Sequence, residues 1–253
     1  MTSLLANPIW HSLSTRHADL SQGNDLAKRY PEAIGPLSGI PEPSAECWQA
    51  LKALVPPGDQ CVLFLNEPAA PGGGLELVAQ FPIEQMQFES SMSLSSTDIE
   101  IAAIEALGEN DVREMMSLAA LTEPGPFRRD TIQLGGYVGI RDGGRLAAMA
   151  GQRTAVPGFR EVSAVCTHPS CRGRGYAALL VGAVMKEMSA LGEVPYLHVR
   201  QDNLSAIRLY RRLGFRIIRT LHCAILMASE GGVPPAHSPG RVTIVDANSN
   251  KNL

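Results

Sequence analysis

One stretch of the chain decides the fold: residues 160–182, which read Arg160-Glu-Val-Ser-Ala-Val-Cys-Thr-His-Pro-Ser-Cys-Arg-Gly-Arg-Gly-Tyr-Ala-Ala-Leu-Leu-Val-Gly182. Its first part is a short apolar run with β-branched residues, which is typical of a strand buried on both faces. Pro169 ends that run, because proline cannot donate to a strand ladder. From Ala177 onward, apolar residues recur at steps of three and four, which predicts a helix that ends at Gly192.

The loop between this strand and this helix is suited to bind an anion. Arg172, Gly173, Arg174 and Gly175 lie at the N-terminus of the predicted helix, where backbone N–H groups have no partner within the helix and the dipole favours negative charge. The two glycines let a bulky anion approach the backbone closely. These residues predict a phosphate or pyrophosphate site, and the alternative is a glycine-rich connection with two solvated arginines.

The same loop also fits the dinucleotide-binding pattern GxGxxA over residues 173–178, and Glu193 lies near the spacing expected for its ribose acid. In the dinucleotide fold the first glycine follows the strand directly, whereas residues 167–172 intervene here. Glu193 also precedes the next predicted strand, residues 196–200, instead of lying at its end. A nucleotide-binding oxidoreductase therefore stays an alternative that the loop length disfavours.

Two motifs carry a resemblance to a known family. Arg172-Gly-Arg-Gly175-Tyr-Ala177 resembles the signature of the GNAT N-acetyltransferase superfamily: arginine or glutamine, two variable residues, glycine, one variable residue, then glycine or alanine. Asn203-x-x-Ala206-x-x-x-Tyr210-x-x-x-Gly214-Phe215 resembles the second motif of that superfamily. Residues 161–169 are similar to the branch close to glycine N-acyltransferases. The resemblance covers residues 101–228.

This resemblance implies an α/β fold of the α+β type, with a mixed, mostly antiparallel sheet flanked by helices. The strands that end near Thr167 and Arg200 are expected to separate and to open a slot for acetyl-CoA. Pantetheine would pair with the first strand, and its pyrophosphate would lie over the loop. The residues that the resemblance implies for cosubstrate binding are Val165, Cys166, Thr167, Arg172, Gly173, Arg174, Gly175, Tyr176, Ala177, Asn203, Ala206 and Tyr210.

The implied reaction is transfer of an acetyl group from acetyl-CoA to a primary amine of a small molecule or peptide. It needs a deprotonated amine, charge stabilisation at the tetrahedral intermediate and a proton for the leaving thiolate. We expect Glu161 as the general base, the Cys166 N–H as the oxyanion donor and Tyr210 as the acid, with His198 as the reserve base. The alternatives are a solvated strand-end carboxylate for Glu161 and a core tyrosine for Tyr210.

A second functional class stays open beside the enzyme. The chain could be a non-catalytic acyl-CoA-binding regulatory module on the same fold, which would bind the cosubstrate without turnover. The sequence does not identify the acceptor, so amino acids, polyamines, antibiotics and peptide N-termini all remain candidates, as do acyl chains longer than acetyl.

Composition places the protein among soluble globular chains. Its 253 residues can bury a sizeable core, 45% of them are hydrophobic, and the mean hydropathy is zero. Apolar stretches such as residues 177–185 are too short to span a bilayer, and the first ten residues carry no positive export signal. The five cysteines form no CxxC pair, and no zinc-ligand spacing is present, so we expect a reducing cytoplasm and no metal.

Charge divides the chain into unequal parts. Residues 1–100 hold 4 basic and 12 acidic side chains, whereas residues 101–228 hold 16 and 11. A basic second part suits an anionic cosubstrate. It does not indicate nucleic acid, because only 5% of the residues are aromatic and the arginines are not interleaved with them.

Three segments are predicted: an N-terminal α/β domain over residues 1–98, which could be a degenerate GNAT-like half; the acetyltransferase domain over residues 101–228; and a flexible tail over residues 229–253. The acidic first segment is expected to shape either the acceptor side of the site or a homodimer contact. We predict helices over residues 18–30, 44–54, 110–121 and 203–213. Strands are predicted over residues 61–65, 75–81, 137–141, 145–154 and 217–227.

Overall fold

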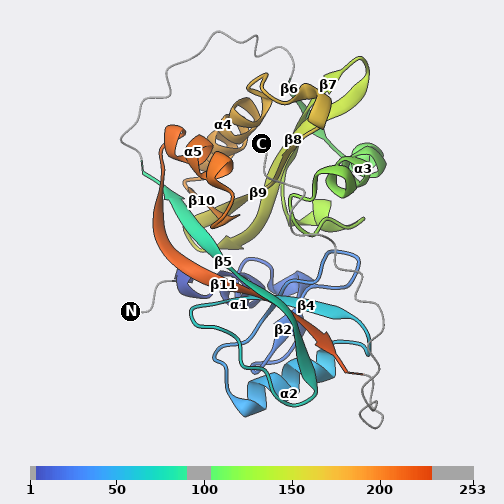
Figure 1. The fold of residues 1–253 in the computed structure, drawn as a ribbon, viewed down its shortest axis with the longest axis vertical. Coiled ribbons are helices and arrows are strands. Elements are labelled where there is room, and N and C mark those ends of the chain that lie inside the picture. Colours follow the sequence, from blue (N-terminus) through green and yellow to red (C-terminus); the bar gives the residue numbers. More distant parts are fainter. Residues whose placement is uncertain (1–3, 90–103, 230–253) are drawn as a thin grey trace.

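The computed structural model describes residues 4–89 and 104–229, and one eight-stranded sheet organises them (Figure 1). In the order in which they lie, its strands are β4 (Gln60–Leu65), β11 (Phe215–Ala228), β5 (Leu75–Phe88), β10 (Val194–Arg200), β9 (Phe159–Thr167), β8 (Arg145–Val156), β7 (Tyr137–Asp142) and β6 (Ile104–Leu107). The β9–β10 pair is parallel, and the other neighbours in this sheet are antiparallel. The predicted mixed, mostly antiparallel sheet is confirmed.

Helices cover both faces of the sheet. They are α1 (Pro8–Ser14), α2 (Ala45–Leu54), α3 (Val112–Thr122), α4 (Tyr176–Ala190) and α5 (Leu204–Arg212), with 3-10 turns at η1 (Leu4–Ala6), η2 (Ala18–Leu20), η4 (Glu109–Asp111), η5 (Thr131–Leu134) and η6 (Pro169–Cys171). On β8, Ala148 and Ala150 share a core with α4, whereas Met149 between them packs with α3. Because successive side chains of a strand point to opposite faces, α3 and α4 lie on opposite sides of the sheet.

Most of the predicted helices are confirmed, and their ends have the expected caps. The Ser44 hydroxyl accepts from the Cys47 N–H at 3.3 Å at the start of α2. The Asn203 side chain accepts from the Ala206 N–H at 3.1 Å at the start of α5. Each bond gives a partner to a backbone donor that the helix itself leaves unpaired.

The helix predicted over residues 18–30 is wrong. The chain there forms η2 and two short strands, β1 (Gln22–Gly23) and β2 (Lys28–Arg29), which pair with β3 (Ser38–Gly39) in a separate sheet. The Asn24 side chain accepts from the N–H groups of Leu26 and Ala27 at 2.9 and 3.2 Å. This local turn competes with helical hydrogen bonds.

Strand β5 is longer than the sequence predicts, because it continues through Pro82 to Phe88. The Pro82 carbonyl accepts from the Gln201 N–H at 3.2 Å, so the nitrogen of Pro82 also faces the β10 side. The last β5–β10 pair is Ile83 with Arg200, so Pro82 lies just beyond the end of the ladder. The sheet therefore tolerates a proline that lacks a donor there.

The first segment of the chain contributes to the main sheet. Strand β5 lies between β11 and β10, and β4 pairs with β11, so the sheet continues across the predicted domain division. In Figure 1, β5 and β11 run together from the half with α4 and α5 to the half with α2. The division at residues 98–101 and the tail after residue 229 lie outside the described residues and stay predictions. Among the described helices, none is long and apolar enough to cross a bilayer.

Candidate active site

The parallel strands β9 and β10 separate after a short paired region. Their pairs end at Tyr196 with Glu161, yet β9 continues to Thr167 and β10 to Arg200. Side chains and backbone groups of the two strands therefore diverge around a wedge. This is the separation that the resemblance implies.

A bulge in β9 lies beside the wedge. Between the pairs Met149–Cys166 and Gly151–Ser163, one residue of β8 faces two residues of β9, and Ala164, one of those two, has a φ of 52°. A bulge leaves one residue outside the ladder, so the β9 backbone here can face the wedge instead of β8. The Cys166 side chain packs in the core beneath α3, and burial raises the pKa of its thiol to about 11.

A cavity of about 440 Å³ opens at the wedge. Seven of the residues predicted to bind acetyl-CoA line it: Val165, Cys166, Thr167, Arg172, Asn203, Ala206 and Tyr210. The Thr167 hydroxyl is buried and has no hydrogen-bond partner among residues 4–89 and 104–229. An unpaired polar group in this wall is suited to bind a polar group of the pantetheine arm.

The other five predicted residues lie in the loop and the first turn of α4. Gly173 and Gly175 have φ values of 79° and 80°, a left-handed conformation that strongly favours glycine, and Gly175 is the N-cap of α4. Arg174 binds Asp142 at 3.0 Å, and both side chains are about half exposed. The loop therefore has the backbone conformation that an anion site requires. The Arg174 side chain is held at the end of β7 by its ion pair with Asp142.

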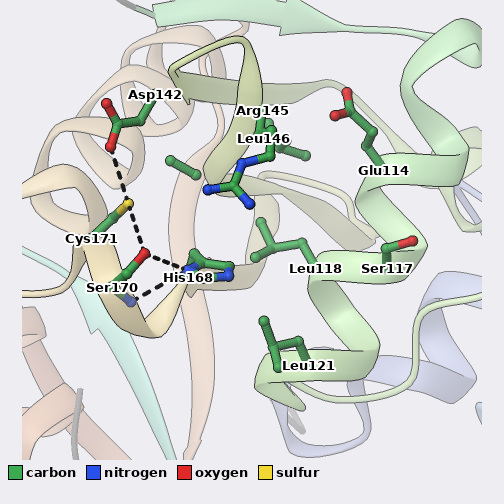
Figure 2. A pocket seen from close by; sticks show the side chains of 11 residues that line it. Glu114, Ser117, Leu118, Leu121, Asp142, Arg145, Leu146, His168, Ser170 and Cys171 are labelled. Atoms are coloured by element: carbon green, nitrogen blue, oxygen red, sulfur yellow. Dashed lines mark hydrogen bonds between the residues drawn. The ribbon is translucent and has the colours of Figure 1, made fainter.

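A smaller cavity of about 230 Å³ lies between α3, the turn from β7 to β8 and residues 168–171 just before this loop (Figure 2). Along one wall, the Cys171 thiol is 3.5 Å from the Asp142 carboxylate, and the Ser170 hydroxyl is 2.8 Å from Nδ1 of His168. None of the predicted site residues lines it. Asp142 connects this cavity to the loop, because it lines the cavity and its carboxylate also binds Arg174.

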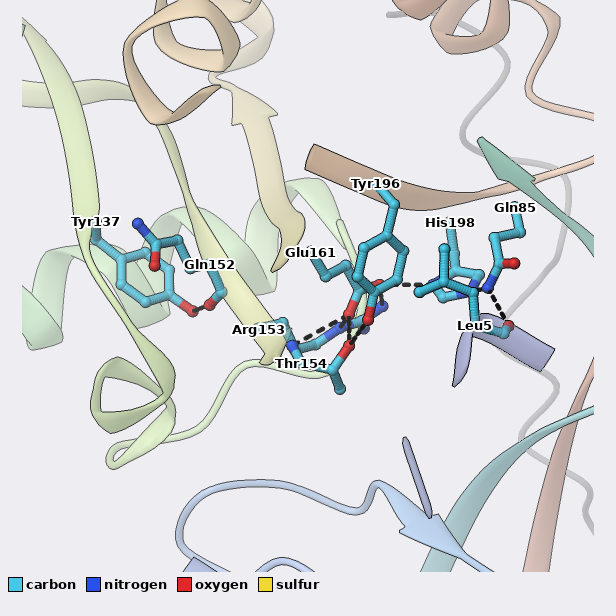
Figure 3. Close-up of polar contacts among 9 residues, drawn as sticks. All are labelled: Leu5, Gln85, Tyr137, Gln152, Arg153, Thr154, Glu161, Tyr196 and His198. Atoms are coloured by element: carbon cyan, nitrogen blue, oxygen red, sulfur yellow. Dashed lines mark hydrogen bonds and ion pairs between the residues drawn. The ribbon is translucent and has the colours of Figure 1, made fainter. Parts of the chain in front are cut away.

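Glu161 is completely buried, so the alternative of a solvated carboxylate is wrong. Its oxygens bind Nε and Nη2 of Arg153 at 3.0 and 2.5 Å and the Thr154 hydroxyl at 2.6 Å (Figure 3). Burial would raise the pKa of Glu161, but the Arg153 charge and His198 outweigh it and hold the pKa well below its usual range. A carboxylate with so low a pKa takes up a proton poorly.

His198 continues this network into the cavity wall (Figure 3). Its Nδ1 lies 2.6 Å from Glu161, and its Nε2 lies 2.9 Å from the amide nitrogen of Gln85, which also donates to the Leu5 carbonyl at 2.9 Å. An amide nitrogen only donates, so we assign the proton to Nδ1 and the lone pair to Nε2. Burial lowers the pKa of His198, and Glu161 only partly offsets this, so the ring is neutral near pH 7.

Tyr210 lies across the wedge on α5 and is buried. Burial raises the pKa of its hydroxyl above the ordinary value, and the nearby Cys166 adds to the effect. The hydroxyl therefore keeps its proton at neutral pH. His198 on β10 and Tyr210 on α5 thus line the same cavity.

Comparison with known proteins identifies the family. Residues 137–223 match the family described as FR47-like protein. A solved structure from Novosphingobium aromaticivorans, described as an acetyltransferase from the GNAT family, is 41% identical, and the alignment covers 90% of this chain and 100% of the other, with a TM-score of 0.83. The chain belongs to the GNAT family of acetyltransferases. GNAT acetyltransferases use acetyl-CoA, and the residues around the wedge are suited to bind it.

More distant relatives match parts of this GNAT chain. The N-alpha-acetyltransferase RimI of Mycobacterium tuberculosis is 40% identical over 83 residues, which are 32% of this chain and 51% of its own length. A mycothiol acetyltransferase of Mycobacteroides abscessus is 40% identical over 65 residues, 25% of this chain and 22% of its own. The chain therefore spans about half or less of these curated relatives. A GCN5-related N-acetyltransferase from Kribbella flavida, 19% identical with a TM-score of 0.54, shares the fold.

Membership in the GNAT family excludes the alternative hypothesis that the loop belongs to a nucleotide-binding oxidoreductase. The structure gives the local reason, because Glu193 is buried and bound by Arg160 and so does not face the loop as a ribose acid would. The narrower resemblance to glycine N-acyltransferases stays a prediction. Sequence reasoning missed Gln85 and Arg153, and no motif around either residue indicates the site.

Proposed function

We propose that the protein transfers an acetyl group from acetyl-CoA directly to a primary amine, with His198 as the general base. The single observation that supports this most is one continuous cavity that joins the residues of the cosubstrate site, Tyr210 among them, to His198. A binding module would have no need of His198 in that cavity. The cavity thus favours an enzyme over the regulatory alternative.

In the proposed reaction, the amine lone pair attacks the thioester carbonyl carbon, and His198 Nε2 takes up the amine proton. The amine, or a water that relays its proton, replaces the Gln85 N–H on that lone pair. A β9 backbone N–H at the bulge stabilises the oxyanion; the N–H of Cys166 itself is less suited, because Cys166 pairs with Met149 in the β8–β9 ladder. When the intermediate collapses, the C–S bond breaks and Tyr210 gives its proton to the CoA thiolate; the proton on His198 then returns to Tyr210 through solvent, which restores both groups. Glu161 keeps the Nδ1 proton of His198 in place and stabilises the imidazolium that forms.

Transfer through Cys166 is disfavoured. The reactive form of a cysteine is the thiolate, and a buried thiol with a pKa of about 11 is almost fully protonated at neutral pH. The Cys166 thiol therefore has no part in the proposed reaction.

The function is tested by mixing the purified protein with acetyl-CoA and a panel of primary amines while free thiol is measured. Amine-dependent thiol release, with the acetylated amine identified by mass spectrometry, is the expected result. Binding of acetyl-CoA in calorimetry without release for any amine would favour the regulatory module.

Gly175→Val is expected to weaken acetyl-CoA binding by about tenfold or more, equal to about 1.4 kcal/mol. A β-branched side chain at a φ of 80° distorts the helix N-terminus and fills the space that the pyrophosphate needs. Gly192→Val is the matched control, since Gly192 has a φ of 71° at the other end of α4 with open space around it. Calorimetry should show the loss for Gly175→Val alone; equal affinities in both variants would remove the loop from the cosubstrate site.

Tyr210→Phe is expected to lower kcat by roughly 10- to 1,000-fold, within or near the range of a positioned acid. The thiol of CoA resembles cysteine, with a pKa of about 8.5, so its thiolate leaves without full assistance and some activity remains. Tyr137→Phe is the control, because that buried hydroxyl donates to the Gln152 carbonyl at 3.0 Å. It should lose about 0.5–1.5 kcal/mol of stability and keep its turnover. The reverse pattern would make Tyr210 a core tyrosine.

A further inference from the structure

The cavity extends well beyond the wedge. Past His198 on β10 it continues over β5, β11 and β4, where its wall consists of Phe81, Ile83, Cys223, Ile225, Val62 and Phe64. We call these six side chains the apolar floor. The sheet curls here, because the Phe64 ring of β4 lies with its centroid 4.7 Å from that of the His198 ring on β10, three strands away in the sheet order. The floor therefore begins directly beside His198, where it can cover a branched or aromatic side chain of the acceptor.

The charges that line the cavity fit an anion better than a second cation. Arg153, Arg172 and Arg200 line it, whereas Glu123 is its one lining carboxylate among the described residues and is exposed. A polyamine or aminoglycoside needs several carboxylates to replace the water around its ammonium groups. The lining supplies those partners poorly.

Arg153 offers a specific contact for a carboxylate. Its side chain is only 12% exposed, and Nε and Nη2 bind Glu161, but Nη1 makes no hydrogen bond to any of the described residues. Nη1 lies 3.9 Å from the position that a Cβ on Gly125 would take, and Gly125 is part of the same cavity wall. A buried guanidinium with an unused donor is suited to bind an anion.

Arg153 and His198 share one hydrogen-bond partner. Arg153 Nη2 and His198 Nδ1 both bind Oε1 of Glu161, at 2.5 and 2.6 Å, so the two side chains are close neighbours, and Nη1 and Nε2 are the second nitrogens of the same two groups. The Phe64 ring packs against both groups, with its centroid 5.5 Å from the Arg153 guanidinium carbon and 4.7 Å from the His198 ring centroid. Two groups this close together suit a compact acceptor, in which the amine and the carboxylate are attached to the same carbon.

We propose that the acceptor is an α-amino acid with an apolar side chain. Its amine faces His198, its carboxylate binds Nη1 of Arg153, and its side chain lies on the apolar floor. This inference rests on the proposed acetyl transfer and goes further by naming the acceptor class.

The test compares wild-type kcat/KM for L-leucine, glycine, leucinamide, 3-methylbutylamine and spermidine with acetyl-CoA. Leucine should exceed glycine, which leaves the floor uncovered, by about tenfold or more, and should exceed the carboxylate-free amines by a similar or larger factor. This series leaves Arg153 intact, so the result does not depend on whether a variant folds.

Ile225→Ala tests the floor separately. It should raise KM for leucine severalfold or more and leave glycine kinetics unchanged, whereas Ile217→Ala, on the same strand but outside the cavity, should change neither.

Several outcomes would overturn the inference. Equal turnover of leucine and 3-methylbutylamine, or a preference for spermidine, would contradict the acceptor class while acetyl transfer itself stood. A gain from octanoyl-CoA over acetyl-CoA, with glycine as good as leucine, would assign the floor to the donor's acyl chain. Acetyl-CoA binding without turnover of any amine would refute both this inference and the proposed function.

Discussion

Replacing His198 by glutamine is expected to lower kcat by about 100- to 10,000-fold, the contribution of a positioned general base. Glutamine can still donate to Glu161 and accept from Gln85, so the network around Arg153 should persist. It cannot take up a proton at neutral pH. Acetyl-CoA affinity and melting temperature should therefore change little, and kcat measured at saturating amine should account for nearly the whole effect.

The pH dependence of kcat identifies the base independently. His198 acts when it is unprotonated, and burial lowers its pKa below the ordinary value of 6.5. We therefore expect kcat of the wild type to be level near neutral pH and to decrease as the pH falls through the pKa of His198, below 6.5. His198→Gln should lose this acidic limb. An unchanged limb in that variant would assign the titration to another group.

The parts of the fold that local residues determine are the parts that the sequence predicts. Asn203 caps α5, Ser44 caps α2, and the glycines before α4 have the positive φ that their loop needs. In each case a short-range hydrogen bond or a backbone preference selects the structure within a few residues. The two acetyltransferase motifs combine such signals, and the sequence therefore predicts the wedge and its loop.

The polar network behind the wedge depends on contacts that no local pattern contains. Gln85 lies 113 residues from His198, and Leu5 lies 80 residues from Gln85. The predicted end of β5 at residue 81, before Pro82, also excluded Gln85 from any strand. The family resemblance predicts Glu161 as the base, because a carboxylate on this strand fits the family. Its partners, however, are Arg153 on β8 and His198 on β10, which no local pattern around Glu161 indicates. The pairing of distant strands brings these residues together, and their proposed roles depend on that pairing.

Glu161→Gln is expected to destabilise the protein by about 3–5 kcal/mol, because it leaves the buried Arg153 charge without its counter-ion. Glu89→Gln is the matched control: Glu89 binds Arg216 at 2.7 Å in a pair whose side chains are 46% and 70% exposed, and such pairs contribute about 0–1 kcal/mol. Urea unfolding of both variants at pH 7 measures the difference.

The pH dependence of stability should have the same origin. The folded-state pKa of Glu161 is depressed below the unfolded value of 4.5, so its stabilising effect is fully present above that value and is lost as the pH falls through the folded-state pKa. The Glu161→Gln variant should therefore lack that part of the acid-induced loss. Kinetics then separate the two roles of the residue: if Glu161 orients His198, folded Glu161→Gln retains an acidic limb below pH 6.5, shifted downward because a charge that raises the His198 pKa is gone. If Glu161 is itself the base, the folded variant is inactive at every pH and His198→Gln remains active, which would contradict the assignment made here.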